Sequence, residues 1–223
     1  MIGAMIYKDA LIVKRTMGLY AALMALYVGM TAVGVFEGMS MVNSFAAMFS
    51  VSIPLACFSL DELARWEKFA VTLPLGRKGI VQAKYVLILL LTVGTTLLIM
   101  LMNLALFAFF PSRISSLPVG LLSVAGITAA SLLIHAVMMP ACFRFGVQKA
   151  RVVVFVTLGA TVSAITGIGM MTTFPMRATA AISGWGPMLW QITATVLGVL
   201  VVTLALLFVS YQVSLRIYEK REF

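Results

Sequence analysis

Long apolar runs separated by short polar breaks dominate the pattern of this chain. Each run is close to the roughly 20 residues that an α-helix needs to cross a bilayer. We therefore predict six membrane-spanning helices, at residues 16–36, 41–60, 84–110, 119–140, 151–173 and 187–213. The predicted fold class is an all-α membrane protein, with a single transmembrane domain over residues 1–223.

Composition supports this fold class. The chain is 62% hydrophobic and 10% charged, whereas soluble domains are about half apolar and about a quarter charged. The net charge of +9 could indicate a nucleic-acid-binding surface. However, the basic residues lie between apolar blocks, as the positive-inside bias of membrane proteins requires. We expect contact with membrane lipid and none with nucleic acid.

The distribution of cations predicts the orientation in the membrane. If the N-terminus is cytoplasmic, all but two of the 16 Lys and Arg residues lie on the inner side, and only Arg113 and Arg177 lie outside. Cytoplasmic loops are enriched in such residues. An even number of spans then returns the C-terminus to the cytoplasm.

Residues 1–15 have the pattern of an amphipathic helix lying in the membrane interface. Its cations, Lys8, Lys14 and Arg15, point away from its apolar side, although Asp9 falls within the apolar arc. The alternative is an irregular extension of the next helix. The apolar side comprises Ile2, Met5, Ile6, Ile12 and Val13.

The longest polar interval, residues 61–83, predicts a short cytoplasmic helix from Asp61 to Leu73. Ser59 and Glu62 fit a capping box at its start, Asp61 and Arg65 are spaced to pair, and Pro74 would end it. Its apolar side, which includes Trp66, could rest on lipid head groups or fit a groove in a partner.

Motifs of known chemistry are scarce. The chain has one histidine, no HExxH or GxSxG motif and no GxxxxGK[ST] phosphate loop, so we predict no catalytic, metal or cofactor-binding residues. His135 is either a functional ionisable group or, as we favour, a hydrogen-bonding partner of a neighbouring helix. Asn103 and Gln191 are interpreted as polar links between helices, and Lys84 as a cation that reaches the head groups.

Two cysteines, Cys57 and Cys142, fall near the predicted inner ends of spans. A disulfide is not expected in a reducing compartment. We interpret both as small apolar packing residues.

Three blocks carry a resemblance to a known family. The polar interval contains Asp61-Glu62, Trp66-Glu67-Lys68-Phe69, Leu73-Pro74-Leu75-Gly76-Arg77 and the segment 80–85. The other blocks are Pro140 to Arg151, which includes Phe143-Arg144-Phe145-Gly146, and Tyr7-Lys8-Asp9. With these blocks the chain resembles the permease subunits of type-2 ABC exporters, especially small six-helix permeases linked to export of, or immunity to, toxic amphipathic peptides.

The resemblance implies a permease of the bacterial cytoplasmic membrane that exports substrate, pairs with a second copy as a homodimer, and binds two cytoplasmic ABC ATPase subunits, which hold ATP and magnesium. Residues 1–15 would form an elbow helix, marked by Tyr7, Lys8 and Asp9, and residues 61–83 a coupling segment. The implied ATPase-coupling residues are Asp61, Glu62, Arg65, Trp66, Glu67, Phe69, Leu73 and Arg77. The implied second cytoplasmic loop contains Phe143, Arg144, Phe145, Gly146, Lys149 and Arg151. Two alternatives are a membrane scaffold that docks a cytoplasmic partner and an autonomous carrier or channel.

Overall fold

The computed structural model describes residues 2–35, 40–70, 76–110, 117–161, 163 and 185–220, and all regular structure in these residues is helical. Residues 147–161 form a helix, here called the 147–161 helix. The other helices are α1 (Ile2–Val33), α2 (Ser40–Leu63), α3 (Trp66–Ala70), α4 (Gly76–Phe109), α5 (Leu117–Phe145) and α7 (Trp185–Glu219).

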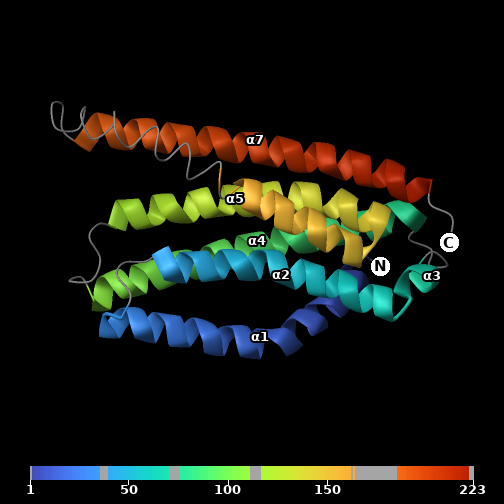
Figure 1. The fold of residues 1–223 in the computed structure, drawn as a ribbon, viewed down its shortest axis with the longest axis horizontal. Coiled ribbons are helices and arrows are strands. Elements are labelled where there is room, and N and C mark those ends of the chain that lie inside the picture. Colours follow the sequence, from blue (N-terminus) through green and yellow to red (C-terminus); the bar gives the residue numbers. More distant parts are fainter. Residues whose placement is uncertain are drawn as a thin grey trace.

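The long helices lie side by side, with α1 on one side of the bundle and α7 on the other (Figure 1). Both ends of the chain and the short α3 lie at the same end of the bundle, which we call the α3 end (Figure 1). The largest core cluster includes Phe58, Ile88, Met138, Phe143 and Tyr218. It joins α2, α4, α5 and α7 toward this end.

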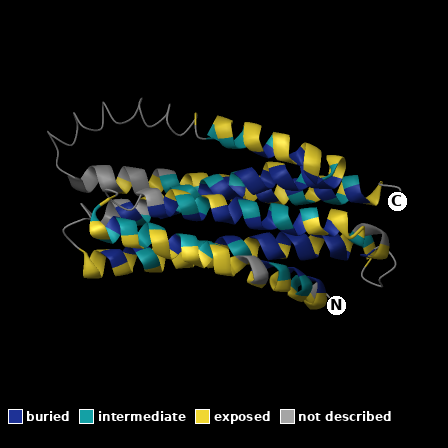
Figure 2. Cartoon of the chain, turned by 60° about the horizontal axis from the view of Figure 1, so that its bottom comes forward, coloured by how far each residue is buried: buried dark blue, intermediate teal, exposed yellow. Residues whose placement is uncertain are grey.

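Burial differs strongly between the helices. In the most apolar stretch of α2 and of α5, 56% of the residues are buried, against 28% in α4 and 17% in α7. Figure 2 shows the exposed residues along the outside of the bundle, and many of them are large and apolar, such as Leu90 and Leu101 of α4 and Phe208 of α7. Apolar side chains that face outward along helices of this length are typical of contact with lipid.

Within the described residues, length and composition qualify four helices to cross a membrane: Val42–Leu63, Gly76–Phe109, Ser123–Phe145 and Val196–Glu219. α1 adds a fifth if its two halves, Gly3–Lys14 and Met17–Val33, form one bent span; they meet at 50°. Of the predicted fifth span, 151–173, the stretch from 164 onward lies outside the described residues. The count of six therefore stays a prediction.

The predicted helix ends are wrong in the polar interval. α2 continues through the proposed capping box to Leu63, and α4 already begins at Gly76, so the interval 61–83 is mostly helical and belongs to longer helices. A local capping motif competes with the continuation of the preceding helix, and here Asp61 and Glu62 make contacts with other helices instead. The described part of the predicted helix 61–73 is reduced to α3, after a turn in which Arg65 adopts φ 48°.

Candidate functional site

Four charged side chains from three helices meet at the α3 end. They are Lys8 and Asp9 of α1, Asp61 of α2 and Lys84 of α4, here called the charge quartet. Lys84 Nζ lies 2.8 Å from Asp9 Oδ2 and 2.6 Å from Asp61 Oδ2. Lys8 Nζ lies 2.5 Å from Asp61 Oδ1 and 3.2 Å from Asp9 Oδ1. Each cation therefore contacts both carboxylates.

Three members of the charge quartet are deeply buried. Asp9, Asp61 and Lys84 are 2%, 7% and 6% exposed. A buried charge is costly unless it is paired and hydrogen-bonded, and here two cations balance two anions. Loss of one member would leave an uncompensated charge in the interior, which is strongly destabilising. The quartet thus fixes the positions of α1, α2 and α4 relative to each other.

α3 contacts the charge quartet through Trp66. Lys8 Nζ lies 4.4 Å from the centroid of the Trp66 ring, within the range of a cation–π interaction. The outer side of this region is apolar and exposed, since Leu63 is 78% and Phe69 55% exposed. α3 therefore contacts the charge quartet through Trp66, and the exposed Phe69 of α3 lies near the exposed Leu63 at the end of α2.

Glu62 connects the end of α2 to the start of the 147–161 helix. Its Oε2 accepts a hydrogen bond from the backbone N–H of Val147 at 2.9 Å, so it caps that helix in the way that an acidic N-cap residue does. Gly146 allows the sharp turn before the helix, with φ 77°, and a Cβ there would lie 3.2 Å from Glu62 Oε1. Arg151 also donates to Ser59 Oγ at 3.4 Å.

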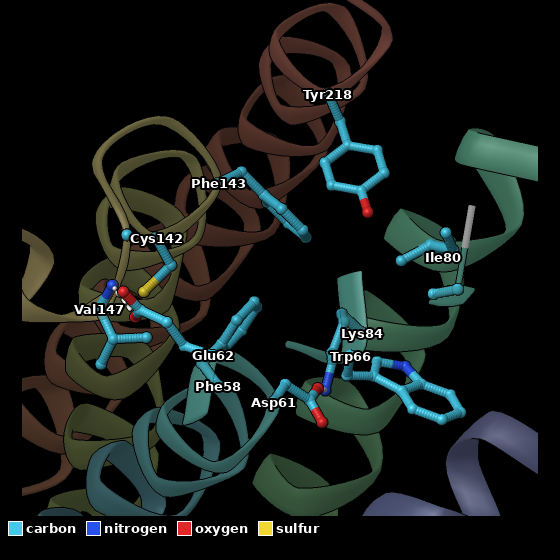
Figure 3. A pocket seen from close by; sticks show the side chains of 12 residues that line it. Phe58, Asp61, Glu62, Trp66, Ile80, Lys84, Cys142, Phe143, Val147 and Tyr218 are labelled. Atoms are coloured by element: carbon cyan, nitrogen blue, oxygen red, sulfur yellow. Dashed lines mark hydrogen bonds and ion pairs between the residues drawn. The ribbon is translucent and has the colours of Figure 1, made fainter. Parts of the chain in front are cut away.

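A small pocket of about 40 Å³ lies between these contacts (Figure 3). The hydroxyl of Tyr218 points toward its middle in Figure 3. A pocket of this volume holds one or a few water molecules, so it is too small for an exported substrate. Its lining consists of Phe58, Asp61, Glu62, Trp66, Ala70, Ile80, Lys84, Cys142, Phe143, Gly146, Val147 and Tyr218.

α4 and α7 are also joined at the α3 end. Arg77 donates a hydrogen bond to the backbone carbonyl of Glu219, and Lys78 Nζ lies 3.7 Å from Glu219 Oε1 with both side chains largely exposed. Two turns deeper, the Tyr85 hydroxyl lies 2.7 Å from Ser210 Oγ and 2.8 Å from Ser214 Oγ.

The structure brings together residues from all three blocks that the sequence singled out. Asp61, Trp66, Lys8 and Asp9 belong to one cluster, and Glu62 contacts the turn at Gly146. The predicted pairing of Asp61 with Arg65 is wrong: Asp61 pairs with Lys8 and Lys84, and Arg65 is exposed in the turn before α3.

Other predicted residues lie apart from the charge quartet. Tyr7 and Phe145 are exposed, as is Lys149, and the Arg144 guanidinium lies 5.2 Å from the Phe145 ring. Phe143 is buried, with its ring 5.4 Å from those of Phe58 and Tyr218. Leu73 and the side chain of Glu67 lie outside the described residues.

Lys84 is the residue that sequence reasoning misplaced. It does not reach outward to head groups but lies buried between two carboxylates, because their charges compensate its own. One signal could have indicated this. Asp9 falls within the apolar arc of residues 1–15, and an acid that faces the interior requires a cation close by.

The polar side chains within the bundle act as links between helices, as predicted. His135 Nε2 lies 3.1 Å from the Ser50 carbonyl of α2. The Asn103 amide donates to Asn43 Oδ1 at 2.8 Å. Cys57 and Cys142 are buried free thiols, and the side chain of Gln191 lies outside the described residues.

The apolar outer faces and the four or five membrane-compatible helices define a multi-pass membrane protein. The chain matches the family model described as "ABC-2 family transporter protein" over residues 4–219, which is nearly its whole length. It therefore belongs to the ABC-2 transporter family, and the resemblance to type-2 ABC permeases is confirmed. Comparisons with curated proteins and with solved structures found no match.

Proposed function

We propose that this chain is the membrane-spanning permease subunit of an ATP-driven exporter in the bacterial cytoplasmic membrane. It forms the translocation path with a second copy of itself, and two cytoplasmic ABC ATPase subunits bind the ATP and magnesium. Membership of the ABC-2 family supports the transport role. The proposal includes six spans, an elbow helix over residues 1–15, and both termini in the cytoplasm, since the chain ends lie at the α3 end, where the cations gather (Figure 1).

The observation that carries the proposal is the arrangement around α3. Its inner side rests on Lys8 through Trp66, whereas Phe69 and the neighbouring Leu63 are exposed. Exposed apolar side chains on and beside a short helix, which the charge quartet holds in place, suit docking into a groove of a partner. We propose that the ATPase binds this outer side and that α3, together with the ends of α2 and α4, serves as the coupling segment.

The substrate class that we propose is amphipathic peptides, which rests on the resemblance of the three sequence blocks. The pocket at the α3 end is too small to bind such a molecule. The substrate is therefore expected to pass along the membrane-spanning helices, away from this pocket.

Reconstitution tests the proposal. The chain is co-expressed with the ATPase encoded beside it, and vesicles containing both are assayed for ATP hydrolysis and for uptake of a fluorescent amphipathic helical peptide. Phe69→Ala is compared with Phe155→Ala, which truncates another exposed phenylalanine, on the 147–161 helix. We expect Phe69→Ala to weaken ATPase binding about 30-fold, the loss typical of an interface hot spot, and Phe155→Ala to leave it unchanged.

The other outcomes separate the competing functions. Absence of ATPase binding by the unaltered chain would make the proposal wrong. Binding without stimulated hydrolysis would indicate a scaffold, and peptide flux through the chain alone would indicate an autonomous carrier.

A further inference from the structure

We propose that the charge quartet makes the first part of α1, the end of α2 and the start of α4 one rigid unit that moves together with α3, and that Lys84 is the positioning residue of this unit. The inference rests on the proposed function, because it identifies the helices to which force applied at α3 is delivered.

Lys84 is suited to this role because one atom joins three helices. Its Nζ contacts carboxylates of α1 and α2 within 2.8 Å and lies 5.0 Å from the ring of Phe58 in α2. Separation of α4 from either helix would strand a buried carboxylate without its cation, which costs far more than the loss of an exposed ion pair. The three helix segments are therefore expected to keep their relative positions while the transporter changes state.

Force at α3 reaches the unit by a short route. Trp66 contacts Lys8, and Lys8 contacts both Asp61 and Asp9. The polar link from this region to the 147–161 helix is weaker than the quartet, because the exposed Glu62 accepts one hydrogen bond from the Val147 N–H and Arg151 donates a long one to Ser59. Apolar residues such as Val147 and Ala150 also pack in the core cluster, but a shift of these residues strands no buried charge. The 147–161 helix is thus the neighbour that can shift relative to the unit.

A charge-neutral double variant breaks the unit without leaving a bare charge. This quartet variant combines Asp9→Asn with Lys84→Met, so it removes one anion and one cation and keeps the contact of Lys8 with Asp61. The matched control variant combines Arg216→Met with Glu219→Gln, which also removes one cation and one anion at the same end. Both residues are exposed and belong to α7, outside the proposed coupling segment.

Distances between spin labels distinguish a rigid unit from a role in folding alone, because a role in folding alone would not make these distances depend on nucleotide. Labels at the exposed Ala10 of α1 and Gln82 of α4 report on the unit, and labels at Ala10 and Gln148 report on motion relative to the 147–161 helix. Each pair is measured in the complete complex with the ATPase, with and without a non-hydrolysable ATP analogue. We expect the first distance to stay constant and the second to change.

In the quartet variant, we expect the Ala10–Gln82 distance to vary with nucleotide. ATPase binding should be kept, whereas membrane-subunit-stimulated hydrolysis should fall about tenfold, a magnitude typical of lost coupling between sites. The control variant should behave like the unaltered chain. Normal stimulation and a constant Ala10–Gln82 distance in the quartet variant would overturn the rigid unit alone. The same conclusion would follow if, in the unaltered complex, the Ala10–Gln82 distance changed with nucleotide or neither distance changed. Failure of the unaltered chain to bind the ATPase would overturn the proposed function as well.

Discussion

A proline in α2 explains the position of the only histidine. Pro54 lies inside α2 and has no backbone N–H, so the carbonyl four residues earlier, at Ser50, lacks its usual helical donor. His135 of α5 is fully buried, and its Nε2 lies 3.1 Å from that carbonyl. Because a carbonyl only accepts, Nε2 must carry the hydrogen. The histidine thus supplies the donor that the proline removes.

We predict that the two residues are energetically coupled. His135→Leu leaves the Ser50 carbonyl without a partner inside the bundle, which should cost about 1–3 kcal/mol. In a Pro54→Ala background the new N–H of residue 54 can bond Ser50, so the cost of His135→Leu should fall by about 1–2 kcal/mol. Pro140→Ala in α5 is the matched control, since it introduces an N–H that cannot reach Ser50, and it should leave the cost unchanged.

The assay is unfolding in mixed micelles by titration with sodium dodecyl sulfate, followed by circular dichroism. The unaltered chain, the two single variants and the double variant complete one thermodynamic cycle, and the Pro140 series provides a second. Distant, independent sites add to within about 0.5 kcal/mol. If the costs of Pro54→Ala and His135→Leu are additive within that limit, the hydrogen bond to Ser50 contributes nothing and the reasoning is wrong.

Three further substitutions, the first with a matched control, test other contacts with the same titration. Gly146→Ala requires a side chain at φ 77° with its Cβ 3.2 Å from Glu62 Oε1, and we expect a loss of about 1–3 kcal/mol. The control is Gly94→Ala, where a Cβ meets nothing within 4 Å, and this change should stabilise α4 by up to about 1 kcal/mol. Equal effects of Gly146→Ala and Gly94→Ala on stability would contradict a strained turn at Gly146. Tyr85→Phe removes the hydroxyl between two serines of α7 and should cost about 1–2 kcal/mol; unchanged stability would exclude a contribution from these bonds. Asn103→Leu breaks the contact with α2 and should cost about 0.6–2 kcal/mol, and a stabilised variant would show that packing outweighs the amide link.

The membrane character of the chain could be predicted from sequence because it depends on local composition. A run of apolar residues long enough to cross a bilayer needs no knowledge of its neighbours. The ends of the helices are harder to predict from sequence than the apolar runs. The start of α4 at Gly76, before the predicted residue 84, depends on packing at the α3 end, which brings cationic residues such as Lys84 into a compensated interior.

The predicted amphipathic helix after Ser59 shows why local motifs mislead at such places. The spacing of Ser59 and Glu62 satisfies a capping box, yet Glu62 caps the 147–161 helix, which begins 85 residues later at Val147. A carboxylate can satisfy any nearby helix start, and the sequence does not state which one folding brings close. What the pattern identified correctly is the chemistry of Glu62, and what it could not identify is the partner.

The charge quartet extends the same argument to function. Counting Lys8 and Lys84 toward the positive-inside bias treats every inner cation as solvated, so the ion pairs of the charge quartet are not visible in a charge count. Asp9 on the apolar side of its helix indicates that one cation must be buried, but Lys84 is 75 residues distant, and only the packing of α4 against α1 and α2 selects it. A carrier driven by its own ion gradient would place such charges midway along the helices. Here they gather at the end where α3 lies, which is the place that the proposed coupling to an ATPase requires.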